Sequence, residues 1–451
     1  MTIQLEALTE AIRGEILTAG TPGYDEARAL WNGMIDKRPG AIVRCTGVAD
    51  VIATVNFARE QDLPLAIKAG GHNVSGKAMC DDGIVIDLSP MNNVHIDPIA
   101  RRARAGAGAK WGAFDHEAQA FGLTTTGGVV SSTGVAGLTL GGGIGYLTRT
   151  YGLACDNLLS VDLVTAAGEL VRASEDENPE LFWALRGGGG NFGVVTSLEF
   201  QLHSVGPMVA TATIFHAIED ARSVLDLYRT FNETAPDELA CYAMIVNAPE
   251  DLPDQQGKAV LAIVGLYSGN AEEGLQLMAP LADMGSPLVA LIDPMPYTVM
   301  QTAFDAGNPH GARYYWKSQY LGGLDDAFLD IVVDRAMDIR GDHTIIGIEP
   351  MGGAQGRVDP GATAFACRNV PYSLGIWAGW QDPGQDDANI AWTRAFFDAV
   401  APFGVGAYVN YLGEDESDRL DEVYGENYDR LKAVKQKWDP NNLFRLNHNI
   451  A

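Results

Sequence analysis

The sequence predicts an α+β fold in which an antiparallel sheet is covered by helices on one face. As far as about residue 205, short strands and short helices alternate with glycine-rich loops. Beyond the segment 203–208 (H-S-V-G-P-M), long amphipathic helices alternate with apolar strands. Such a succession is typical of one sheet layer packed against one helix layer. At 451 residues, the chain is long enough for two or three separate cores.

The composition excludes several classes of function. Apolar residues make up 47% of the chain and charged residues 20%, the balance of a water-soluble globular protein. The N-terminus lacks a signal pattern and no apolar run is long enough to span a bilayer, so we expect a cytoplasmic protein. A net charge of −27 makes nucleic acid and anionic membranes poor partners. The acidity fits either a salt-tolerant source or an ordinary acidic bacterial enzyme.

The cysteines give no sign of a metal centre. They are odd in number, lie far apart and form no C-x-x-C pair: Cys45, Cys80, Cys155, Cys241 and Cys367. This pattern argues against a disulfide framework and against zinc. We therefore expect no metal ion.

The elements of the first half follow from periodicity and from turn residues. The predicted helices are 24–32, 50–60, 110–120 and 179–185, and the predicted strands are 40–44, 65–68, 84–88, 103–107 and 194–202. Asp50 is the expected N-cap of the second helix. A hairpin of strands 159–165 and 169–173 turns at Ala167-Gly168.

The predicted strand 65–68 leads into a loop that reads A-G-G-H-N-V-S-G-K-A. Gly70 and Gly71 allow positive φ angles and a close approach of the backbone to a ligand. His72 would then present a ring nitrogen next to several free N–H groups. The residues alone leave two readings open, a loop that faces a ligand or a loop with an ordinary polar histidine.

The densest glycine region is 124–145, T-T-T-G-G-V-V-S-S-T-G-V-A-G-L-T-L-G-G-G-I-G. So many glycines predict neither a regular helix nor a central strand. A backbone wrapped around a phosphate-bearing ligand through N–H groups and hydroxyls would explain the region, and so would a loop-rich structural segment. It matches neither G-x-G-x-x-G after a strand nor a phosphate loop. A second glycine run, R-G-G-G-G-N-F-G, occupies 186–193.

The second half is predicted to be richer in long helices. The predicted helices are 217–231, 272–284, 325–339, 386–400 and 428–438, and the predicted strands are 259–267, 312–320, 344–348, 372–380 and 407–412. The last helix is expected to end at Asp439-Pro440 because the residue before a proline disfavours helix.

Five segments together resemble the flavin-linked oxidases of the vanillyl-alcohol-oxidase superfamily, in the berberine-bridge-enzyme-like branch. They are G-G-H-N at 70–73, the glycine run 131–145, Y-G-L-A-C-D-N at 151–157, the run 186–193 and W-D-P-N-N-L-F-R-L-N-H-N-I at 438–450. The resemblance covers essentially the whole chain and is strongest to bacterial amine-oxidising and oligosaccharide-oxidising members. It implies a PCMH-type FAD-binding domain made of residues 1–205 and 405–451, with a substrate-binding domain, residues 206–404, between them.

The resemblance implies FAD attached covalently through its 8α-methyl group to His72. Relatives with a second, cysteinyl bond carry that cysteine eleven residues before the triple glycine, where this chain has Val130, so we expect one bond only. Cys155 is expected to be a packed thiol near the flavin. The other positions implied to hold FAD are Gly70, Gly71, Asn73, Val74, Ser75, Gly128, Ser131, Ser132, Thr133, Gly134, Gly137, Leu138, Gly142, Gly143, Gly145, Asn157, Val195, Tyr408, Asn410 and Asn447.

An oxidase of this family needs a base that takes a proton from the substrate. In alcohol-oxidising relatives the base is the tyrosine of a Y-x-N motif, which corresponds to Tyr408 and Asn410. On an extended strand these two side chains share one face and Tyr411 lies on the other, so Tyr408 is the first candidate and Tyr411 the second. A free phenol has a pKa of about 10, so this role needs a shift. The alternative is that both tyrosines only pack at the domain junction.

The middle section supplies candidates for the substrate site. Glu349 ends the strand T-I-I-G-I-E and resembles an acidic residue of amine-oxidising relatives. It would hold a cationic amine or act as the base, or else be an exposed carboxylate at a strand end. The expected pocket residues are Tyr315, Trp316, Lys317, Arg368, Tyr372 and Trp377, although aromatic residues on strands also pack in cores.

The function implied by the resemblance is that of an FAD-dependent oxidase. Hydride passes from an alcohol, a sugar or an amine to the flavin, which O2 reoxidises to give H2O2. The expected partners are therefore a small organic molecule and O2, and the sequence sets no oligomeric state. Two alternatives stay open, a flavin dehydrogenase with another acceptor and a flavin-binding protein without turnover.

Overall fold

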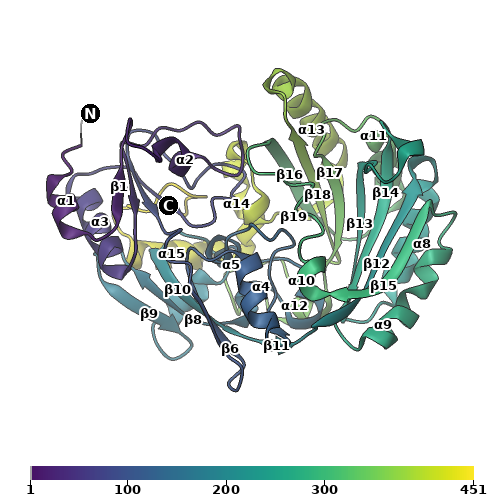
Figure 1. The fold of residues 1–451 in the computed structure, drawn as a ribbon, viewed down its shortest axis with the longest axis horizontal. Coiled ribbons are helices and arrows are strands. Elements are labelled where there is room, and N and C mark those ends of the chain that lie inside the picture. Colours follow the sequence, from purple (N-terminus) through teal and green to yellow (C-terminus); the bar gives the residue numbers. More distant parts are fainter. Residues whose placement is uncertain (1–2) are drawn as a thin grey trace.

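The computed structural model describes residues 3–451, which form two lobes that lie side by side (Figure 1). The first lobe runs from α1 (Glu6–Ala11) to β11 (His203–Ser204) and is completed by α14 (Leu420–Tyr424) and α15 (Tyr428–Trp438). The second lobe lies between these two parts of the chain. None of the helices within residues 3–451 is both long and apolar enough to cross a membrane.

The first lobe contains two main sheets. One has the order β1 (Glu15–Leu17), β2 (Ala41–Arg44), β4 (Ile84–Asp87), β3 (Leu65–Lys68), and its last three strands are parallel. The other is antiparallel, in the order β5 (Val94–Asp97), β6 (Arg102–Gly106), β10 (Val194–Gln201), β8 (Leu158–Val164), β9 (Leu170–Ser174). The remaining helices of the first part of this lobe are α2 (Tyr24–Arg28), α3 (Val48–Glu60), α4 (Trp111–Gln119), α5 (Val135–Leu140), α6 (Thr148–Tyr151) and α7 (Pro179–Leu185). A short strand, β7 (Leu123–Thr124), pairs with β11.

Both ends of the chain contribute to one hydrophobic core in the first lobe. Leu8 and Val43 near the start are buried in the same cluster as Leu431, Phe444 and Ile450 near the end. The C-terminal segment therefore returns to the first lobe after the chain has built the second.

The second lobe is built on one antiparallel sheet of eight strands. Its order is β15 (Val289–Pro296), β12 (Met208–Ala217), β14 (Ala259–Tyr267), β13 (Leu239–Asn247), β17 (Ile345–Pro350), β18 (Tyr372–Trp380), β16 (Arg313–Leu321), β19 (Gly404–Gly406). The helices of this lobe are α8 (Ala221–Glu233), α9 (Ala271–Met278), α10 (Tyr297–Met300), α11 (Asp326–Ala336), α12 (Gly353–Arg357) and α13 (Asp386–Val400).

The two faces of this sheet have different neighbours (Figure 1). One face packs against α8, α9, α11 and α13, with Ile263, Phe328 and Phe396 buried between the layers. The other face turns toward the first lobe, where Tyr242 lies in a cluster with Tyr146 of the first lobe. This arrangement confirms the predicted α+β class, an antiparallel sheet with helices on one face.

Several predicted elements match the structure at both bounds. These are β3, α7, β14, β18, α13 and α15, and the hairpin of β8 and β9 also forms. The sequence analysis missed β12, β13 and β15, because their apolar runs adjoin long helices whose periodicity dominates the pattern. It also excluded a regular helix from the glycine region, where α5 forms a short one.

Two local predictions were wrong. Asp50 is the third residue of α3 and not its N-cap, because its carboxylate instead accepts hydrogen bonds from the backbone N–H groups of Arg13, Gly14 and Thr46. Residues 407–412 do not form a strand: after β19 the chain makes a 3-10 turn at Val409–Tyr411.

Candidate active site

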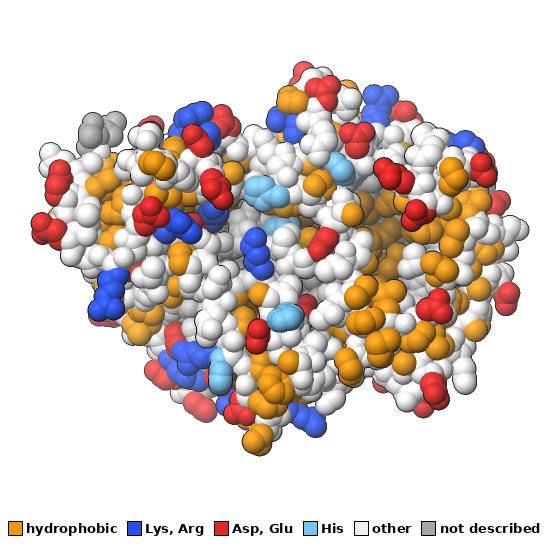
Figure 2. Space-filling view, in the orientation of Figure 1, with side chains coloured by type: hydrophobic (Ala, Val, Ile, Leu, Met, Phe, Trp, Pro, Cys, Tyr) orange, Lys and Arg blue, Asp and Glu red, His pale blue; other side chains and the backbone are white. Residues whose placement is uncertain are grey.

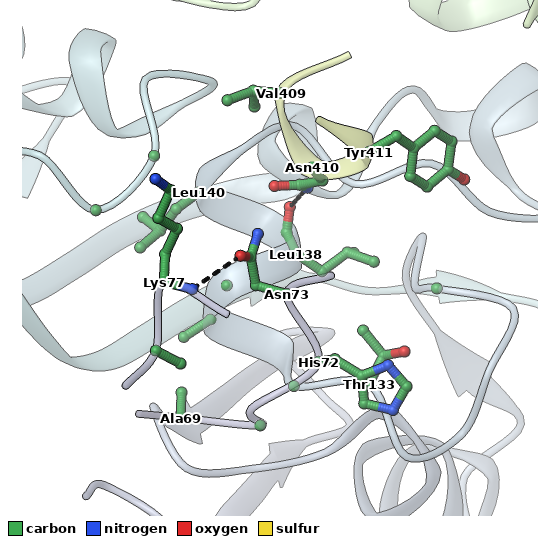
Figure 3. A pocket seen from close by; sticks show the side chains of 18 of the residues that line it. Ala69, His72, Asn73, Lys77, Thr133, Leu138, Leu140, Val409, Asn410 and Tyr411 are labelled. Atoms are coloured by element: carbon green, nitrogen blue, oxygen red, sulfur yellow. Dashed lines mark hydrogen bonds between the residues drawn. The ribbon is translucent and has the colours of Figure 1, made fainter. Parts of the chain in front are cut away.

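A cavity of about 320 Å³ lies between the two lobes. Glycine-rich segments of the first lobe line one side, and apolar side chains from the second lobe's sheet line the other. The C-terminal segment adds Val409–Tyr411 and Leu446–His448. Figure 3 shows His72, Asn73, Thr133, Asn410 and Tyr411 around this space, from parts of the chain far apart in sequence.

His72 lies in the wall of the cavity with its ring fixed on two sides. Its Nε2 is 2.7 Å from Ser132 Oγ, and its ring stacks on Trp31 with 4.7 Å between the centroids. Burial, with smaller contributions from Lys110 and His310, lowers the pKa of His72 to about 3. The imidazole is therefore neutral at physiological pH, and because Ser132 holds Nε2, Nδ1 is the nitrogen available for a bond.

Glycine is required where the two ligand-facing loops meet. A Cβ on Gly134 would come within 2.7 Å of the Gly70 backbone, so the loops touch only because both residues lack side chains. Gly71 also has φ of +69°, a value that favours glycine. This contact brings Ser132 to His72.

Twelve of the predicted flavin positions line the cavity. They are Gly70, Gly71, His72, Asn73, Gly128, Thr133, Gly134, Gly137, Leu138, Val195, Asn410 and Asn447. The others lie behind this layer: Val74, Ser75, Ser131, Ser132, Gly142, Gly143, Gly145, Asn157 and Tyr408. Ser132 still contacts His72, whereas Ser131 and Asn157 bond to other parts of the protein.

The C-terminal side of the cavity fits a polar ligand. Asn447 donates through Nδ2 to the Phe444 carbonyl at 2.9 Å, but its buried Oδ1 has no hydrogen-bond partner among the described residues. A buried polar atom left unpaired costs about 1–3 kcal/mol. With the glycine-lined groove and a neutral histidine, these residues suit a flat, phosphate-bearing cofactor such as FAD.

The 3-10 turn reverses the expected positions of the two tyrosines. Tyr411 lines the cavity, whereas Tyr408 lies behind the glycine run, where its Oη accepts hydrogen bonds from Gly143 N and Asn410 Nδ2, each at 2.8 Å. Burial raises the pKa of Tyr408 above that of a free phenol. Tyr408 thus supports the cavity wall, because the alternation of an extended strand does not apply to a turn.

Glu349 and Tyr411 meet in the cavity wall. The Tyr411 hydroxyl donates to Glu349 Oε1 at 3.1 Å, while Oε2 of the same buried carboxyl has no hydrogen-bond partner in the described part of the chain. Burial raises the pKa of Glu349 to about 7. Burial, followed by the Glu349 charge, raises the pKa of Tyr411 well above its usual value. The phenol therefore stays protonated while the carboxyl titrates near neutrality.

Of the six expected pocket residues, Trp316 and Trp377 line the cavity. Lys317 and Tyr315 project from the opposite face of β16, where Lys317 Nζ lies 3.0 Å from Asp415 and the Tyr315 hydroxyl 2.6 Å from the same carboxylate. Tyr372 packs under the helices. Five positions separate it from Trp377 on β18, so the two side chains point to opposite faces.

Arg368 lies outside the cavity in a buried ion pair. Its guanidinium donates to both oxygens of Asp156, at 2.7 and 2.8 Å, and to Thr363 Oγ1 at 2.6 Å. Cys155, next to Asp156, is buried beside Tyr408 and Phe365, and burial raises the pKa of its thiol. This cluster braces the triple glycine from behind.

The sequence analysis missed several residues of the cavity wall. Trp31 stacks on His72, and Ile345 lies in register with Trp377 on the neighbouring strand. Trp316, which was expected, lies in register with Trp377 on its other side. The sequence around Trp31 carried no signal of its role. No group of three or more metal-ligating side chains occurs in residues 3–451.

The comparisons with known proteins decide the family. A family model described as FAD binding domain matches residues 39–174, and one described as berberine and berberine like matches residues 407–451. An FAD-linked oxidoreductase of Dictyostelium discoideum is 33% identical over 447 residues, which span 98% of this chain and 95% of that protein. The chain belongs to the berberine-bridge-enzyme-like (BBE-like) family of FAD-linked oxidoreductases.

Other BBE-like proteins match over the whole chain. The (R)-6-hydroxynicotine oxidase of Paenarthrobacter nicotinovorans is 33% identical over 470 residues, 98% of this chain and 97% of that protein. The crystal structure of 6-hydroxy-D-nicotine oxidase from Arthrobacter nicotinovorans superposes with a TM-score of 0.87, at 29% identity and full coverage of both chains. That of xylooligosaccharide oxidase from Myceliophthora thermophila with xylobiose gives 0.86, at 26% identity, covering 99% of this chain and 98% of that one. This BBE-like chain is an FAD-linked oxidoreductase.

Proposed function

We propose that this BBE-like chain is an oxidase that acts on a small organic alcohol, sugar or amine and passes the electrons to O2, with release of H2O2. FAD, attached covalently to His72, supplies the hydride acceptor when it is bound. The observation that carries the proposal is the Glu349–Tyr411 pair, a titrating carboxyl in the wall of a cavity whose other wall suits FAD.

His72 is suited to carry the flavin. A bond to carbon requires a neutral imidazole nitrogen, and the lowered pKa of His72 keeps the ring unprotonated. Ser132 and Trp31 hold the ring in one orientation. The position eleven residues before the triple glycine is Val130, which leaves His72 as the single attachment site.

Glu349 is the base in this proposal. Its raised pKa, about 7, places the titration of the carboxyl in the neutral range, and once ionised the unpartnered Oε2 can take a proton from a substrate O–H or N–H. Tyr411 donates to the other oxygen, which stabilises the ionised form and orients the carboxylate. Tyr411 itself holds its proton too tightly to act as the base.

The shape of the second wall favours particular substrates. Around Glu349, the second lobe contributes Met244, Phe304, Trp316, Ile345 and Trp377, none of which is charged. A substrate with an aromatic or apolar body and one amine or hydroxyl group fits this wall best. Two relatives are named as oxidases of 6-hydroxynicotine and of xylooligosaccharides, which supports a small organic substrate and leaves its chemical class open.

The test begins with the purified protein. After denaturation in acid, fluorescence under ultraviolet light should stay with one peptide that contains His72, and the His72→Ala variant should lose it. The protein is then assayed for peroxide with panels of amines, alcohols and sugars. Photoreduced flavin should recover at once when air is admitted. Slow recovery of the oxidised flavin in air would favour a dehydrogenase. If none of the tested compounds reduces the flavin, a flavin-binding protein without turnover is favoured.

A further inference from the structure

The cavity-facing side of the second lobe's sheet stays apolar beyond the cavity. Directly paired residues in adjacent antiparallel strands share a face. Starting from the cavity-lining Met244 on β13, the pairing leads to Ala262 on β14, Phe215 on β12 and Val289 on β15. A row of four apolar side chains therefore runs from the cavity to the edge of the sheet.

A second row lies beside the first on the same face. It pairs Tyr242 with Val264, Val264 with Thr213, and Thr213 with Leu291. Exposure rises along it, from 2% at Tyr242 to 7% at Val264 and 55% at Leu291. Figure 2 shows apolar side chains gathered on the second lobe, at the right of the view, around a hollow. We call Met244, Ala262, Val264, Phe215, Val289 and Leu291 the apolar strip.

Four of the six strip residues belong to the same hydrophobic cluster as the cavity wall; Val289 and Leu291, at the edge of the sheet, lie outside it. Phe215, Ala262 and Val264 are joined through this cluster to Phe304 and Trp377, which line the cavity. Neither row contains a charged residue, although the chain as a whole carries −27. On this face β17 carries Glu349 in the cavity, and β15 carries its first charged side chain, Asp293, one row beyond the strip. The strip therefore suits a neutral, apolar ligand.

We propose that the apolar strip binds the apolar tail of an amphiphilic substrate whose amine or hydroxyl head reaches Glu349. The inference rests on the proposed function and narrows it to one substrate class. Strands lie ~4.8 Å apart, so from β13 across β14 and β12 to β15 the strip extends about 14 Å. The strip residues near the cavity are already buried, whereas Phe215 and Val289 are half-buried and Leu291 is exposed. A tail lying across the strands would cover these last three side chains.

The continuity with the cavity decides between occupants. A second copy of the chain could pair along the free edge of β15, but it would carry the same large negative charge. It would also leave the hollow behind that edge unfilled (Figure 2). A tail that continues from a substrate held in the cavity fills it without bringing charge.

The test uses two probe series, n-alkylamines and n-alkanols from three to ten carbons. Their dissociation constants are measured by calorimetry without oxygen, on the purified FAD-loaded protein. In the series whose head binds, the dissociation constant should fall about fourfold for each added methylene once the tail reaches the strip. In Phe215→Ser and in Leu291→Ser, the dissociation constants of the long probes should fall less with each added methylene than in the wild type. Those of the short probes should stay unchanged.

Leu170→Ser is the matched control. Leu170 is 52% exposed on β9 of the first lobe, close to the 55% of Leu291, and lies away from the cavity. In this variant the dissociation constant should fall with each added methylene as much as it does in the wild type. Because Leu291 is exposed, its variant should fold even where Phe215→Ser does not.

Three results would overturn the strip as a tail site. The first is a dissociation constant that does not depend on the length of the alkyl chain. The second is a chain-length dependence that is as strong in Phe215→Ser and Leu291→Ser as in the wild type. The third is a dimer in sedimentation that Leu291→Ser dissociates, which would make the strip an interface between copies. The proposed function is tested separately. If no compound reduces the flavin but binding still tightens with chain length, the proposed oxidase activity is wrong, whereas the proposal that the apolar strip binds the tail is retained.

Discussion

Two buried acidic groups differ in how completely they are satisfied. Asp156 meets Arg368 through two hydrogen bonds, and Thr363 and the Leu153 N–H complete the cluster. Glu349 is more deeply buried, at 2% exposure against 9% for the Asp156 side chain, but it has one partner, Tyr411, and one oxygen that no described residue contacts through a hydrogen bond. Both groups are largely shielded from water, so burial alone does not mark a reactive group. The unpaired oxygen in a cavity wall does.

The largest expected effect comes from removing the base. Glu349→Gln keeps the shape of the side chain but cannot take a proton, so flavin reduction by substrate should slow about 10²–10⁴-fold. In the wild type the reduction rate should rise with pH through about 7, because only the ionised carboxylate accepts a proton. Anaerobic stopped-flow across pH 5–9 measures both. If the rate of flavin reduction depends on pH in Glu349→Gln as it does in the wild type, Glu349 is not the base.

A change in the ion pair of Arg368 and Asp156 should affect stability and leave the pH dependence of flavin reduction unchanged. Arg368→Met leaves Asp156 buried without its partner, which should lower the free energy of unfolding by about 3–5 kcal/mol. Urea titration monitored by fluorescence measures this loss. The pH dependence of flavin reduction should keep its midpoint, since Arg368 does not line the cavity. A shifted midpoint would show that the two clusters are coupled.

Tyr411→Phe tests the single partner of Glu349. Without the phenol the ionised carboxylate loses a hydrogen bond, so the pKa of Glu349 should rise by about one unit, and the reduction rate at pH 7 should fall about fivefold. At high pH most of the rate should return. Tyr408→Phe is the matched change outside the cavity, and it should leave the midpoint in place.

The smallest effect is on stability. The pKa of Glu349 is raised on folding, so the folded state binds a proton more tightly than the unfolded state. The contribution of this group to stability is therefore present below about pH 4 and is lost as pH rises through about 7. Glu349→Gln should gain stability relative to the wild type between pH 5 and pH 8 in urea titrations at both values. A constant difference would contradict the raised pKa.

Local sequence was sufficient for much of the frame. The strand before His72, the helix 179–185 and the helix 386–400 form at the predicted bounds, because each depends on periodicity and on turn residues next to it. The glycines around His72 and in 124–145 indicated a backbone that comes close to a ligand, and the contact between Gly70 and Gly134 emerged only from the structure. The family resemblance added the cofactor and the return of the C-terminus.

The tertiary structure decided which side chains face the cavity. Alternation along a strand separates Trp316 from Lys317, and Trp377 from Tyr372, but only the packing of the sheet shows which set faces the first lobe. Tyr411 enters the wall through a turn that depends on contacts with the glycine run. Orientation of a face is set by contacts between residues far apart in the chain, and local periodicity carries no information about them.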